Sequence, residues 1–379
     1  MISIEEKGQC SGCSACYSMC PKEAIAMQED TEGFVYPFVD NSKCINCELC
    51  VKVCPIKKEN KKVVSNIHAI ACKNKEEKIR EESTSGGVFT ALSELVINQG
   101  GVVFGAIYDE NLNVKHSYVE NIDECNKFRG SKYVQSSIGD AFKKVKEFLV
   151  QGRLVMFSGT PCQVAGLYSY LGKEYDNLIL IDLACHGAPS PKVFRKYIKV
   201  LENKEQCRVN NILFRDKETG WKRYSFKVNY ENKIKSEIAF DNIYMKGFLS
   251  DLYLRPSCYE CSFKKPITYA DLTLADYWGV DVIHPEFDDD RGTSLVLINS
   301  AKGKKYINDI VDKLDYIDTD YKQSVRYNPS IEKASTFNDF SRRRKFFKNL
   351  NDKKDIERVI NKYIKPSLIK KIINKLKKC

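Results

Sequence analysis

The order of hydrophobic and polar positions in this chain changes near residue 63. From there to about residue 200, short runs rich in Val, Ile and Leu alternate with amphipathic stretches of helical period. The runs predict strands at 67–71, 102–107, 154–157 and 178–183, and the stretches predict helices at 88–98, 138–149, 163–171 and 191–202. A strand–loop–helix alternation of this kind is typical of an α/β core with a partly parallel sheet.

After residue 200 the pattern becomes richer in strands. Runs at 211–215, 224–230 and 236–240 predict an antiparallel or mixed section. Further strands are expected at 270–275 and 294–299, and a helix at 304–314. The pattern therefore predicts that residues 63–340 form one mixed-sheet domain of the α/β or α+β class. Residues 341–379 predict a basic helical tail that is interrupted near Pro366.

Residues 1–62 lack this alternation and hold eight of the 16 cysteines. The motif Cys-x2-Cys-x2-Cys-x3-Cys-Pro occurs twice with the same spacing, ending at Pro21 and at Pro55. This is the ferredoxin run, in which three cysteines bind one cubane and the fourth binds the other. The spacing predicts two [4Fe–4S] clusters, with the ligands Cys10, Cys13, Cys16 and Cys54 for the first and Cys44, Cys47, Cys50 and Cys20 for the second.

Structural zinc is the alternative for these cysteines. Zinc sites usually show two separated pairs of ligands rather than two matched runs of four, so the spacing favours iron–sulfur clusters. The segment between the runs, 24–40, contains Glu32-Gly33-Phe34 and predicts a hairpin. Two clusters in one small domain of residues 1–62 indicate transfer of single electrons.

Composition and charge narrow the class of protein. With 43% hydrophobic residues, the chain can bury a large core and is not wholly disordered. Met1 to Gln9 contain no apolar segment of a signal peptide, and no apolar run approaches the ~20 residues of a transmembrane helix. We therefore expect a cytoplasmic protein, because clustered cysteines in a reducing compartment bind metal or carry out redox chemistry.

The net charge of +11 belongs to the tail. Residues 341–379 hold 15 Lys or Arg and 3 Asp or Glu, whereas the rest of the chain is nearly neutral. Three interpretations of the tail stay open: a solvated helical face, docking to an acidic partner protein or to the anionic surface of a membrane, and RNA binding. The neutral body does not indicate a general nucleic-acid-binding surface.

Four further cysteines follow predicted elements: Cys162, Cys185, Cys258 and Cys261. The first two come directly after strands, and the last two form a CxxC pair. Loops that follow parallel strands converge on one edge of the sheet, so these thiols could form a four-thiolate site for iron or zinc. The alternative is that Cys162 and Cys185 are small buried residues. The remaining cysteines are expected to be ordinary thiols: Cys72, Cys125, Cys207 and Cys379.

A hydroxyl- and glycine-rich segment precedes the helix predicted at 88–98. Ser85, Gly86 and Gly87 stand where free backbone N–H groups and the positive helix end favour a phosphate. A serine in this place is also a common N-cap, so the segment alone does not decide between the two. Lys132 lies in a turn segment, Gly130–Gln135, that matches no Walker A or GxGxxG motif.

Taken together, these motifs resemble the beta-subunit family of coenzyme F420 hydrogenases and dehydrogenases. The resemblance extends to about residue 300 and rests on the following motifs: Ser85-Gly86-Gly87, Ser131-Lys132-Tyr133-Val134, Gly159-Thr160-Pro161-Cys162-Gln163, Cys185-His186-Gly187, Cys258-x2-Cys261 with Ala270-Asp271, and Gly292-Thr293-Ser294. One departure is His186-Gly187, where archaeal members that use F420 often carry an acidic or polar residue.

The resemblance implies FAD beside a third [4Fe–4S] cluster in the α/β domain. It implies that Cys162, Cys185, Cys258 and Cys261 ligate that cluster. It also implies that Ser85, Gly86, Gly87 and Lys132 contact the flavin and that Gly159, Thr160 and Pro161 border it. His186 next to a ligand could serve as a catalytic proton donor, or could make only a loop hydrogen bond.

Three functions follow as hypotheses. The first is a flavin-dependent iron–sulfur oxidoreductase that exchanges electrons between a hydride carrier, coenzyme F420 or similar, and the clusters, or that reduces an organic substrate at the flavin. The second is a non-catalytic electron-transfer subunit that connects a partner enzyme through its clusters. The third, a structural metal protein, is disfavoured by the doubled ferredoxin run. The first two require a redox partner protein, a ferredoxin or an enzyme subunit.

Overall fold

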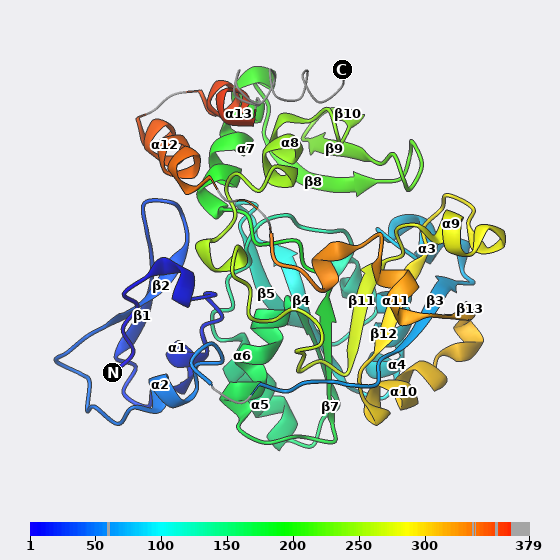
Figure 1. Ribbon diagram of the computed structural model, residues 1–379, viewed down its shortest axis with the longest axis horizontal. Coiled ribbons are helices and arrows are strands. Elements are labelled where there is room, and N and C mark those ends of the chain that lie inside the picture. Colours follow the sequence, from blue (N-terminus) through cyan, green and yellow to red (C-terminus); the bar gives the residue numbers. More distant parts are fainter. Residues whose placement is uncertain (59–60, 336, 338, 353–354, 365–379) are drawn as a thin grey trace, which may run out of the picture.

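The computed structural model describes the chain except for residues 59–60, 336, 338, 353–354 and 365–379 (Figure 1). Its described part forms a two-stranded, a three-stranded and an eight-stranded sheet. The two-stranded sheet belongs to the N-terminal unit, residues 1–58, drawn in blue at the left of Figure 1. The eight-stranded sheet is the centre of the molecule, and the three-stranded sheet lies above it in this view.

The N-terminal unit repeats its backbone as well as its sequence. Its elements are α1 (Ala15–Met19), β1 (Ile25–Glu29), β2 (Val35–Val39) and α2 (Leu49–Lys52). The strands pair antiparallel, as the sequence predicts for the segment 24–40. Each helix starts after a residue in the left-handed conformation, Ser14 (φ 60°) and Glu48 (φ 60°). The same motif therefore makes the same tight loop twice, and each loop turns three cysteines toward one point.

The central sheet is mixed, with the strand order β13-β3-β12-β11-β7-β6-β4-β5. Neighbours β4, β6, β7 and β11 are parallel, and the outer pairs are antiparallel. The strands are β3 (His68–Asn74), β4 (Val102–Tyr108), β5 (Val114–Val119), β6 (Val155–Gly159), β7 (Leu178–Leu183), β11 (Leu272–Asp276), β12 (Ser294–Ile298) and β13 (Leu314–Thr319). A mixed sheet agrees with the predicted fold class.

Successive strand residues point to opposite sides of the sheet, and in this sheet both sides are apolar. Helices therefore cover both faces. In β4, Phe104 packs toward α5 and α6, whereas Val103 packs toward α4 and α10. In β6, Phe157 and Met156 divide in the same way. The helices of the sheet are α3 (Glu77–Glu82), α4 (Val88–Asn98), α5 (Ala141–Val150), α6 (Pro161–Leu171), α9 (Val280–Ile283), α10 (Ala301–Asn308) and α11 (Tyr321–Val325).

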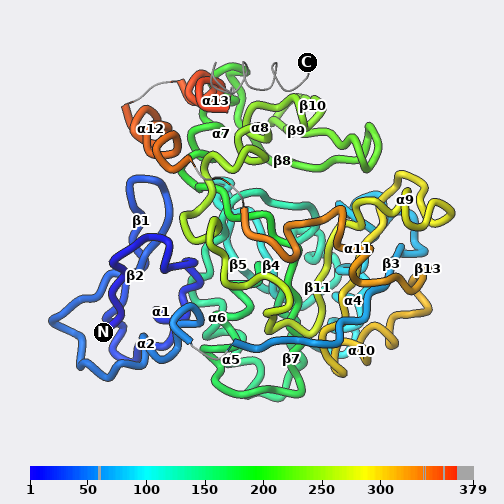
Figure 2. Tube along the Cα trace, in the orientation of Figure 1, coloured from blue at the N-terminus to red at the C-terminus, as the bar shows by residue number. Residues whose placement is uncertain are grey.

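The third sheet packs against four helices around a core rich in tyrosine and phenylalanine. Its strand order is β10-β9-β8, and all its pairs are antiparallel. The elements are α7 (Pro191–Glu205), β8 (Val209–Asp216), β9 (Ser225–Tyr230), β10 (Ile234–Ile238), α8 (Ile243–Leu249), α12 (Phe340–Asn351) and α13 (Ile356–Ile364). Figure 2 shows that α12 and α13 complete this part of the molecule beside α7 and α8.

The prediction of a separate tail at 341–379 is wrong for the residues of α12 and α13 that the structure describes, 341–351 and 356–364. The apolar side chains of α12 and α13 lie in the same core as those of α7 and α8: Phe346, Phe347, Leu350, Ile356, Val359, Ile360 and Tyr363. The abundance of Lys and Arg hid this apolar stripe, because most of these charges, Arg343 excepted, lie on the opposite faces of the helices. The rest of the tail, 365–379, lies outside the described residues.

An ion pair fastens α12 to the N-terminal unit. Arg343 donates from Nη1 and Nη2 to the two carboxylate oxygens of Glu32 at 2.8 and 2.7 Å, and Nη2 also donates to the carbonyl oxygen of Leu254. Both side chains are buried, 6% and 12% exposed. Glu32 lies in the hairpin between β1 and β2, so the two ends of the described chain are joined directly.

Most predicted elements form near the expected positions, but some were missed. The strands β5 and β13 and the helix α8 were not predicted, and the helix expected at 304–314 stops at Asn308. Leu314 instead begins β13, which pairs with β3 at the edge of the sheet. Edge strands alternate apolar and charged residues over only a few positions, so their pattern is weak. None of the helices in the described ranges is long and apolar enough to cross a membrane.

The buried pair between Arg343 and Glu32 predicts a large effect of removing one partner. The substitution Arg343→Met leaves the Glu32 carboxylate buried without its partner and should destabilise the protein by about 3–5 kcal/mol. The fall in the midpoint of anaerobic thermal unfolding measures this loss. The double variant Glu32→Gln, Arg343→Met should recover part of it.

The matched control is Arg195→Gln. It breaks a pair between α7 and Glu29 that joins the same parts of the chain but is partly exposed, at 37% and 41%. We expect a change of about 0–1 kcal/mol there. Equal midpoints for the Arg343→Met and Arg195→Gln proteins would contradict a special role of the buried pair.

Candidate functional site

The first thiol group comprises Cys10, Cys13, Cys16 and Cys54, which the structure brings together from both ferredoxin runs. The pKa of Cys16 is raised to about 12, mainly by burial and also by the neighbouring thiols of Cys10 and Cys54. The pKa of Cys13 is also raised, first by burial and then by the other three thiols of the group. Ionised together, these thiols would repel one another in an apolar place, so a thiolate set here needs a bound cation.

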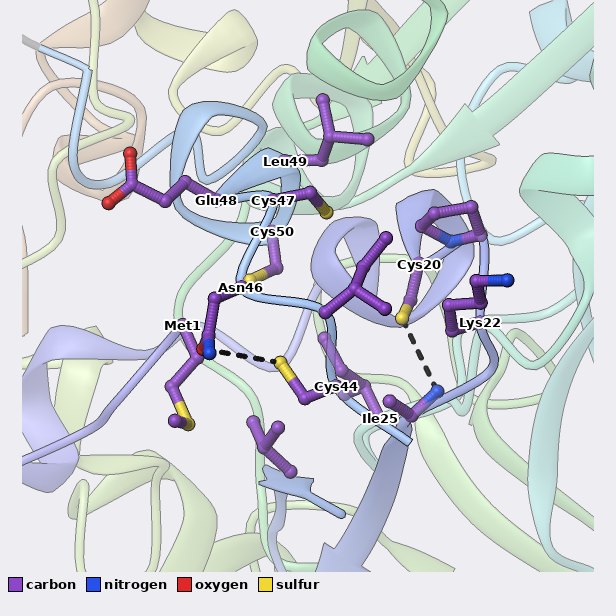
Figure 3. Close-up of a pocket in the computed structure, with 14 residues that line it drawn as sticks. Met1, Cys20, Lys22, Ile25, Cys44, Asn46, Cys47, Glu48, Leu49 and Cys50 are labelled. Atoms are coloured by element: carbon purple, nitrogen blue, oxygen red, sulfur yellow. Dashed lines mark hydrogen bonds between the residues drawn. The ribbon is translucent and has the colours of Figure 1, made fainter. Parts of the chain in front are cut away.

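The second thiol group comprises Cys20, Cys44, Cys47 and Cys50, which line one small cavity (Figure 3). Two of its sulfurs accept backbone hydrogen bonds: Ile2 N–H donates to Cys50 Sγ at 3.2 Å and Ala24 N–H donates to Cys20 Sγ at 3.3 Å. Such bonds stabilise negative charge on sulfur. Cys47 is exposed, so this group lies at the surface of the molecule.

The core thiols are Cys162, Cys185, Cys258 and Cys261. Cys162 is the second residue of α6, which follows β6, and Cys185 follows the neighbouring parallel strand β7. Their loops therefore adjoin at one edge of the sheet, as the sequence predicts. Cys258 ends the short helix η3 (Pro256–Cys258), which brings the CxxC pair to the same place.

The charges of the four core thiols act on one another. The pKa of Cys258 is raised to about 12, mainly by burial and also by Cys162 and Cys261. The pKa of Cys185 is raised by burial and by all three other core thiols, and the ammonium of Lys264 opposes the shift. The structure thus gathers all twelve cysteines of the predicted ligand sets into three groups of four.

Within the described ranges, no three His, Cys, Asp or Glu side chains gather closely enough to hold a single metal ion. The four thiolates of a cubane each bind a different iron atom, so they surround a larger volume than the ligands of one ion.

The first thiol group packs against α6, the helix that begins beside the core thiol Cys162. A Cβ atom on Gly166, in α6, would stand 2.8 Å from Cys13 Cβ and 3.0 Å from its sulfur, so only glycine admits this approach. The buried hydroxyl of Ser11 lies beside the Cys162 thiol. The N-terminal unit is therefore packed onto the helix whose first turn carries a core thiol.

A hydrogen-bond network holds the loop that carries Cys162. Gln163 Oε1 accepts from Thr160 N–H at 3.0 Å, which closes a capping box at the start of α6. Gln163 Nε2 donates to Ser136 Oγ at 2.9 Å, and this hydroxyl meets His116 Nδ1 at 3.1 Å. The Nε2 of the same imidazole lies 3.0 Å from the Ser158 carbonyl oxygen. Thr160, expected to border a flavin, thus holds the core thiol loop.

A separate cavity of ≈ 540 Å³ opens beside β8. Its lining comes from residues 81–84, Tyr108, residues 126–127, residues 129–132 and residues 211–217. The basic side chains of the lining outnumber the acidic ones: Lys127, Arg129, Lys132, Arg215 and Lys217 against Glu81, Glu82 and Asp216. This composition favours an anionic occupant.

Two buried cations of the lining have distinct surroundings. Arg215 pairs with Asp276, but its Nε and Nη2 have no hydrogen-bond partner among the described residues. Lys132 Nζ faces three carbonyl oxygens of its own loop at 3.2–3.4 Å, and burial lowers its pKa to about 8. Arg215 lines the cavity, but its two unpaired nitrogens are themselves buried, and its guanidinium lies over the rings of Tyr224 and Trp278. An isolated arginine within a strand carries no motif, so the sequence pattern did not reveal this residue.

Among the predicted flavin contacts, only Lys132 lines this cavity. Ser85 and Gly86 instead join β3 to β12: Ser85 Oγ donates to the Thr293 carbonyl oxygen, and Gly86 N–H donates to Ser294 Oγ. A Cβ atom on Gly86 would stand 2.3 Å from the Cys72 carbonyl oxygen, so close packing already requires this glycine. Gly87 (φ 84°) is the N-cap of α4. The loop 159–161 directly precedes Cys162, one of the core thiols.

A row of rings connects the cavity with the core thiols. The ring of Tyr133, next to Lys132, stacks on Phe248 with centroids 4.7 Å apart. Phe248 meets the ring of His186 edge to face at 5.0 Å. His186, the residue after Cys185, bonds through Nε2 to Asp251 Oδ1 at 2.5 Å. The predicted proton donor is thus placed at the core thiols and outside the cavity lining.

Comparisons with known proteins agree with this arrangement. Residues 9–58 match the 4Fe-4S dicluster domain, and residues 152–322 match the family described as the C terminus of the beta subunit of coenzyme F420 hydrogenase/dehydrogenase. These matches relate the chain to iron–sulfur electron-transfer proteins of the oxidoreductase class. The chain thus combines a C-terminal domain of the F420 hydrogenase/dehydrogenase beta-subunit family with an N-terminal dicluster domain, which confirms the resemblance seen in the sequence.

Two proteins of Methanocaldococcus jannaschii are similar to the chain. A coenzyme F420-dependent sulfite reductase is 25% identical over 310 residues, 80% of this chain and 46% of the reductase. The chain therefore spans about half the length of this relative. An uncharacterized ferredoxin is 36% identical over 52 residues, 14% of this chain and 66% of the ferredoxin. Among solved structures, a chain of the F420-reducing [NiFe] hydrogenase complex from Methanosarcina barkeri is 16% identical with a TM-score of 0.48, covering 72% of this chain and 92% of that one.

The network around His116 predicts a pH dependence of stability. Burial lowers the pKa of His116 from 6.5 to about 4. Below about pH 6.5 the unfolded chain binds a proton at this residue, whereas the folded protein does not until about pH 4. Stability should therefore fall between about pH 7 and pH 5 by on the order of 2 kcal/mol through this group.

Urea unfolding of the wild type and of His116→Gln at the two pH values isolates this contribution. We expect the variant to be less stable at about pH 7 and to lose less stability on acidification, because its side chain takes up no proton. An equal loss in both proteins would contradict the assignment of a neutral, buried imidazole.

Proposed function

We propose that the protein is a flavin-dependent iron–sulfur oxidoreductase. It exchanges electrons between a hydride carrier, coenzyme F420 or a similar compound, at FAD and [4Fe–4S] clusters on its three thiol groups. The observation that carries the proposal is one buried series: the basic cavity, the rings of Tyr133, Phe248 and His186, the core thiols, and then the first and second thiol groups. The F420-dependent reductase among the relatives supports the choice of carrier.

The thiol groups fit [4Fe–4S] clusters by the chemistry of their donors. Each group offers four sulfurs, the number that one cubane binds. The raised pKa values of Cys16 and Cys258 leave these thiols protonated until a positive metal centre compensates them. The amides of Ile2 and Ala24 in the second group, and of Ala188 toward Cys258 Sγ at 3.3 Å, supply the hydrogen bonds that iron–sulfur thiolates receive.

The cavity fits a flavin dinucleotide in volume and in charge. Its ≈ 540 Å³ lies within the range of cofactor sites, about 300–1,000 Å³. Arg215, with unused Nε and Nη2 donors, would bind a phosphate oxygen of the dinucleotide. Lys132 would hold the dinucleotide from the opposite loop. When bound, a flavin links two-electron exchange with a hydride carrier to single-electron exchange with the clusters.

The residues between the cavity and the core thiols shape the transfer of electrons and protons. Phe248 is buried and Tyr133 is partly buried, so their stacked rings would exclude water from this space. His186 is half-exposed and held by Asp251, so it would move a proton between solvent and the core site while its orientation stays fixed.

The second thiol group would pass electrons to a partner protein. Cys47 is exposed, and three large apolar side chains near it are exposed as well: Met1, Ile45 and Leu49. A redox partner, a ferredoxin or an enzyme subunit, would dock on this face and approach the outermost cluster. The exposed group also favours the alternative function, a non-catalytic subunit that connects a partner enzyme through its clusters.

Cofactor content separates the two functions. Anaerobically purified protein should contain about twelve iron atoms, four for each cubane, and one flavin. A reduced hydride carrier, F420H2 or NAD(P)H, should bleach the flavin when it is added alone. Protein that holds only about eight iron atoms and no flavin would contradict the enzyme and leave the electron-transfer subunit.

Within the same experiment, Cys258→Ser should lose the iron of one cluster. The control Cys207→Ser should keep all of it, because Cys207 bonds to Asn232 and lies outside the three thiol groups. Equal iron in the two variants would remove Cys258 from the ligand set.

The flavin cavity predicts a specific effect of Arg215→Lys. This change keeps the positive charge beside Asp276 and removes the guanidinium donors that are unused in the structure. We expect the flavin content to fall at least tenfold after gel filtration while the iron content stays unchanged, because the cavity is separate from the thiols. Arg223→Gln, an exposed neighbour outside the cavity lining, is the control and should keep its flavin. A normal flavin content in Arg215→Lys would contradict the assigned role of Arg215.

A further inference from the structure

Arg255 is a buried cation between the first thiol group and the core thiols. Its side chain is inside the molecule, at 1% exposure, three residues before Cys258. Its Nε donates to the Cys10 carbonyl oxygen at 2.7 Å, and its Nη2 donates to Cys10 Sγ at 3.5 Å. The charge also acts on the core thiols, since it lowers the pKa of Cys162 and of Cys258 against the effect of burial.

The other contacts of the guanidinium fix its position. Nη1 donates to Gln135 Oε1 at 3.1 Å, and Nη2 also donates to the Val35 carbonyl oxygen at 2.9 Å. The ring of Tyr36 lies 4.4 Å from its central carbon. A Cβ atom on Gly12 would stand 2.7 Å from Nη1, so the cysteine loop closes directly onto the guanidinium. Arg255 is therefore held in one orientation by both parts of the chain.

Arg255 differs from the other buried arginines in having no carboxylate partner among the described residues. Arg80 pairs with Asp289, Arg215 with Asp276 and Arg343 with Glu32. A buried charge without a counter-charge is strongly disfavoured. The groups around Arg255 that can supply negative charge are the thiolates of the two cysteine groups, so its counter-charge is the pair of clusters that they hold.

We infer that Arg255 is a positioning residue that sets the reduction potential of the cluster at Cys10 relative to the potentials of its neighbours. It thereby determines which cluster an electron occupies at equilibrium. This inference rests on the proposed function, because it requires clusters on both thiol groups. A fixed positive charge stabilises the reduced, more negative form of a cluster, and a hydrogen bond to a ligand sulfur acts in the same sense. The step is the passage of one electron between the two clusters, with no proton and no bond exchanged.

Arg255 favours the cluster at Cys10 over the core cluster, because its direct bond goes to Cys10 Sγ. An electron delivered at the core therefore moves toward the N-terminal unit. Removing the guanidinium should lower the potential of the first cluster most, that of the core cluster less, and that of the second ferredoxin cluster least.

The test is a redox titration of the full chain, followed by electron paramagnetic resonance at low temperature, for the wild type, Arg255→Gln and Arg255→Lys. In Arg255→Gln we expect the reduction equilibrium of one cluster to shift at least tenfold toward the oxidised form, about 59 mV for one electron. Arg255→Lys keeps the charge but loses the fork that reaches Cys10 Sγ, so it should shift less. Arg195→Gln removes an equal charge at an exposed place on α7 and should leave every potential unchanged.

Iron content distinguishes a failure of this inference from a failure of the proposed function. Unchanged potentials in an Arg255→Gln protein with full iron would overturn the inference and leave the function standing. If the wild type holds no core cluster, the proposed function fails, while the shift of the cluster at Cys10 is still measured. If Arg255→Gln does not retain iron, the Arg255→Lys protein decides the question. A potential of the cluster at Cys10 below that of the wild type supports the inference, and an unchanged potential overturns it.

Discussion

Burial of cysteine sulfur is the constraint on which the structure of this protein depends. Thiols that are withdrawn from water do not ionise alone, and the raised pKa values of Cys16 and Cys258 show how strongly their surroundings oppose it. In the fold, the thiols stand in groups of four to which more than one loop contributes. Backbone amides donate to some of the sulfurs, and Arg255 lies between two of the groups. The positions of the helices and sheets serve these loops.

Close approach of the backbone then determines where the N-terminal unit contacts the α/β domain. Gly166 in α6 and Gly12 in the first cysteine loop leave no room for side chains, so the N-terminal unit touches the α/β domain at its thiols. Rings fill the corresponding space on the other side of the core thiols, toward the basic cavity. Three rings in contact, those of Tyr133, Phe248 and His186, thus lead from the residue beside Lys132 to the residue beside Cys185.

Much of this could be predicted from the sequence, for a physical reason. Iron–sulfur ligands occur at fixed short spacings, and parallel strands bring their following loops to one edge, so the three cysteine groups follow from local pattern. The cavity could not be predicted, because Arg215, Tyr108 and the 81–84 segment meet only through tertiary packing. Ser85 and Gly86 fit a phosphate motif, yet their hydrogen bonds serve the contact of β3 with β12. Net charge concealed the apolar stripe of α12 and α13.

The buried ion pair between Glu32 and Arg343 has a consequence for the synthesis of the chain. Its two residues are 311 positions apart, so the ribosome completes most of the chain before the contact can form. The segment that is made first is thus among the last to be secured. Until α12 has been made, the Glu32 carboxylate lacks its buried counter-charge, so the hairpin between β1 and β2 reaches its full stability only when Arg343 docks on it.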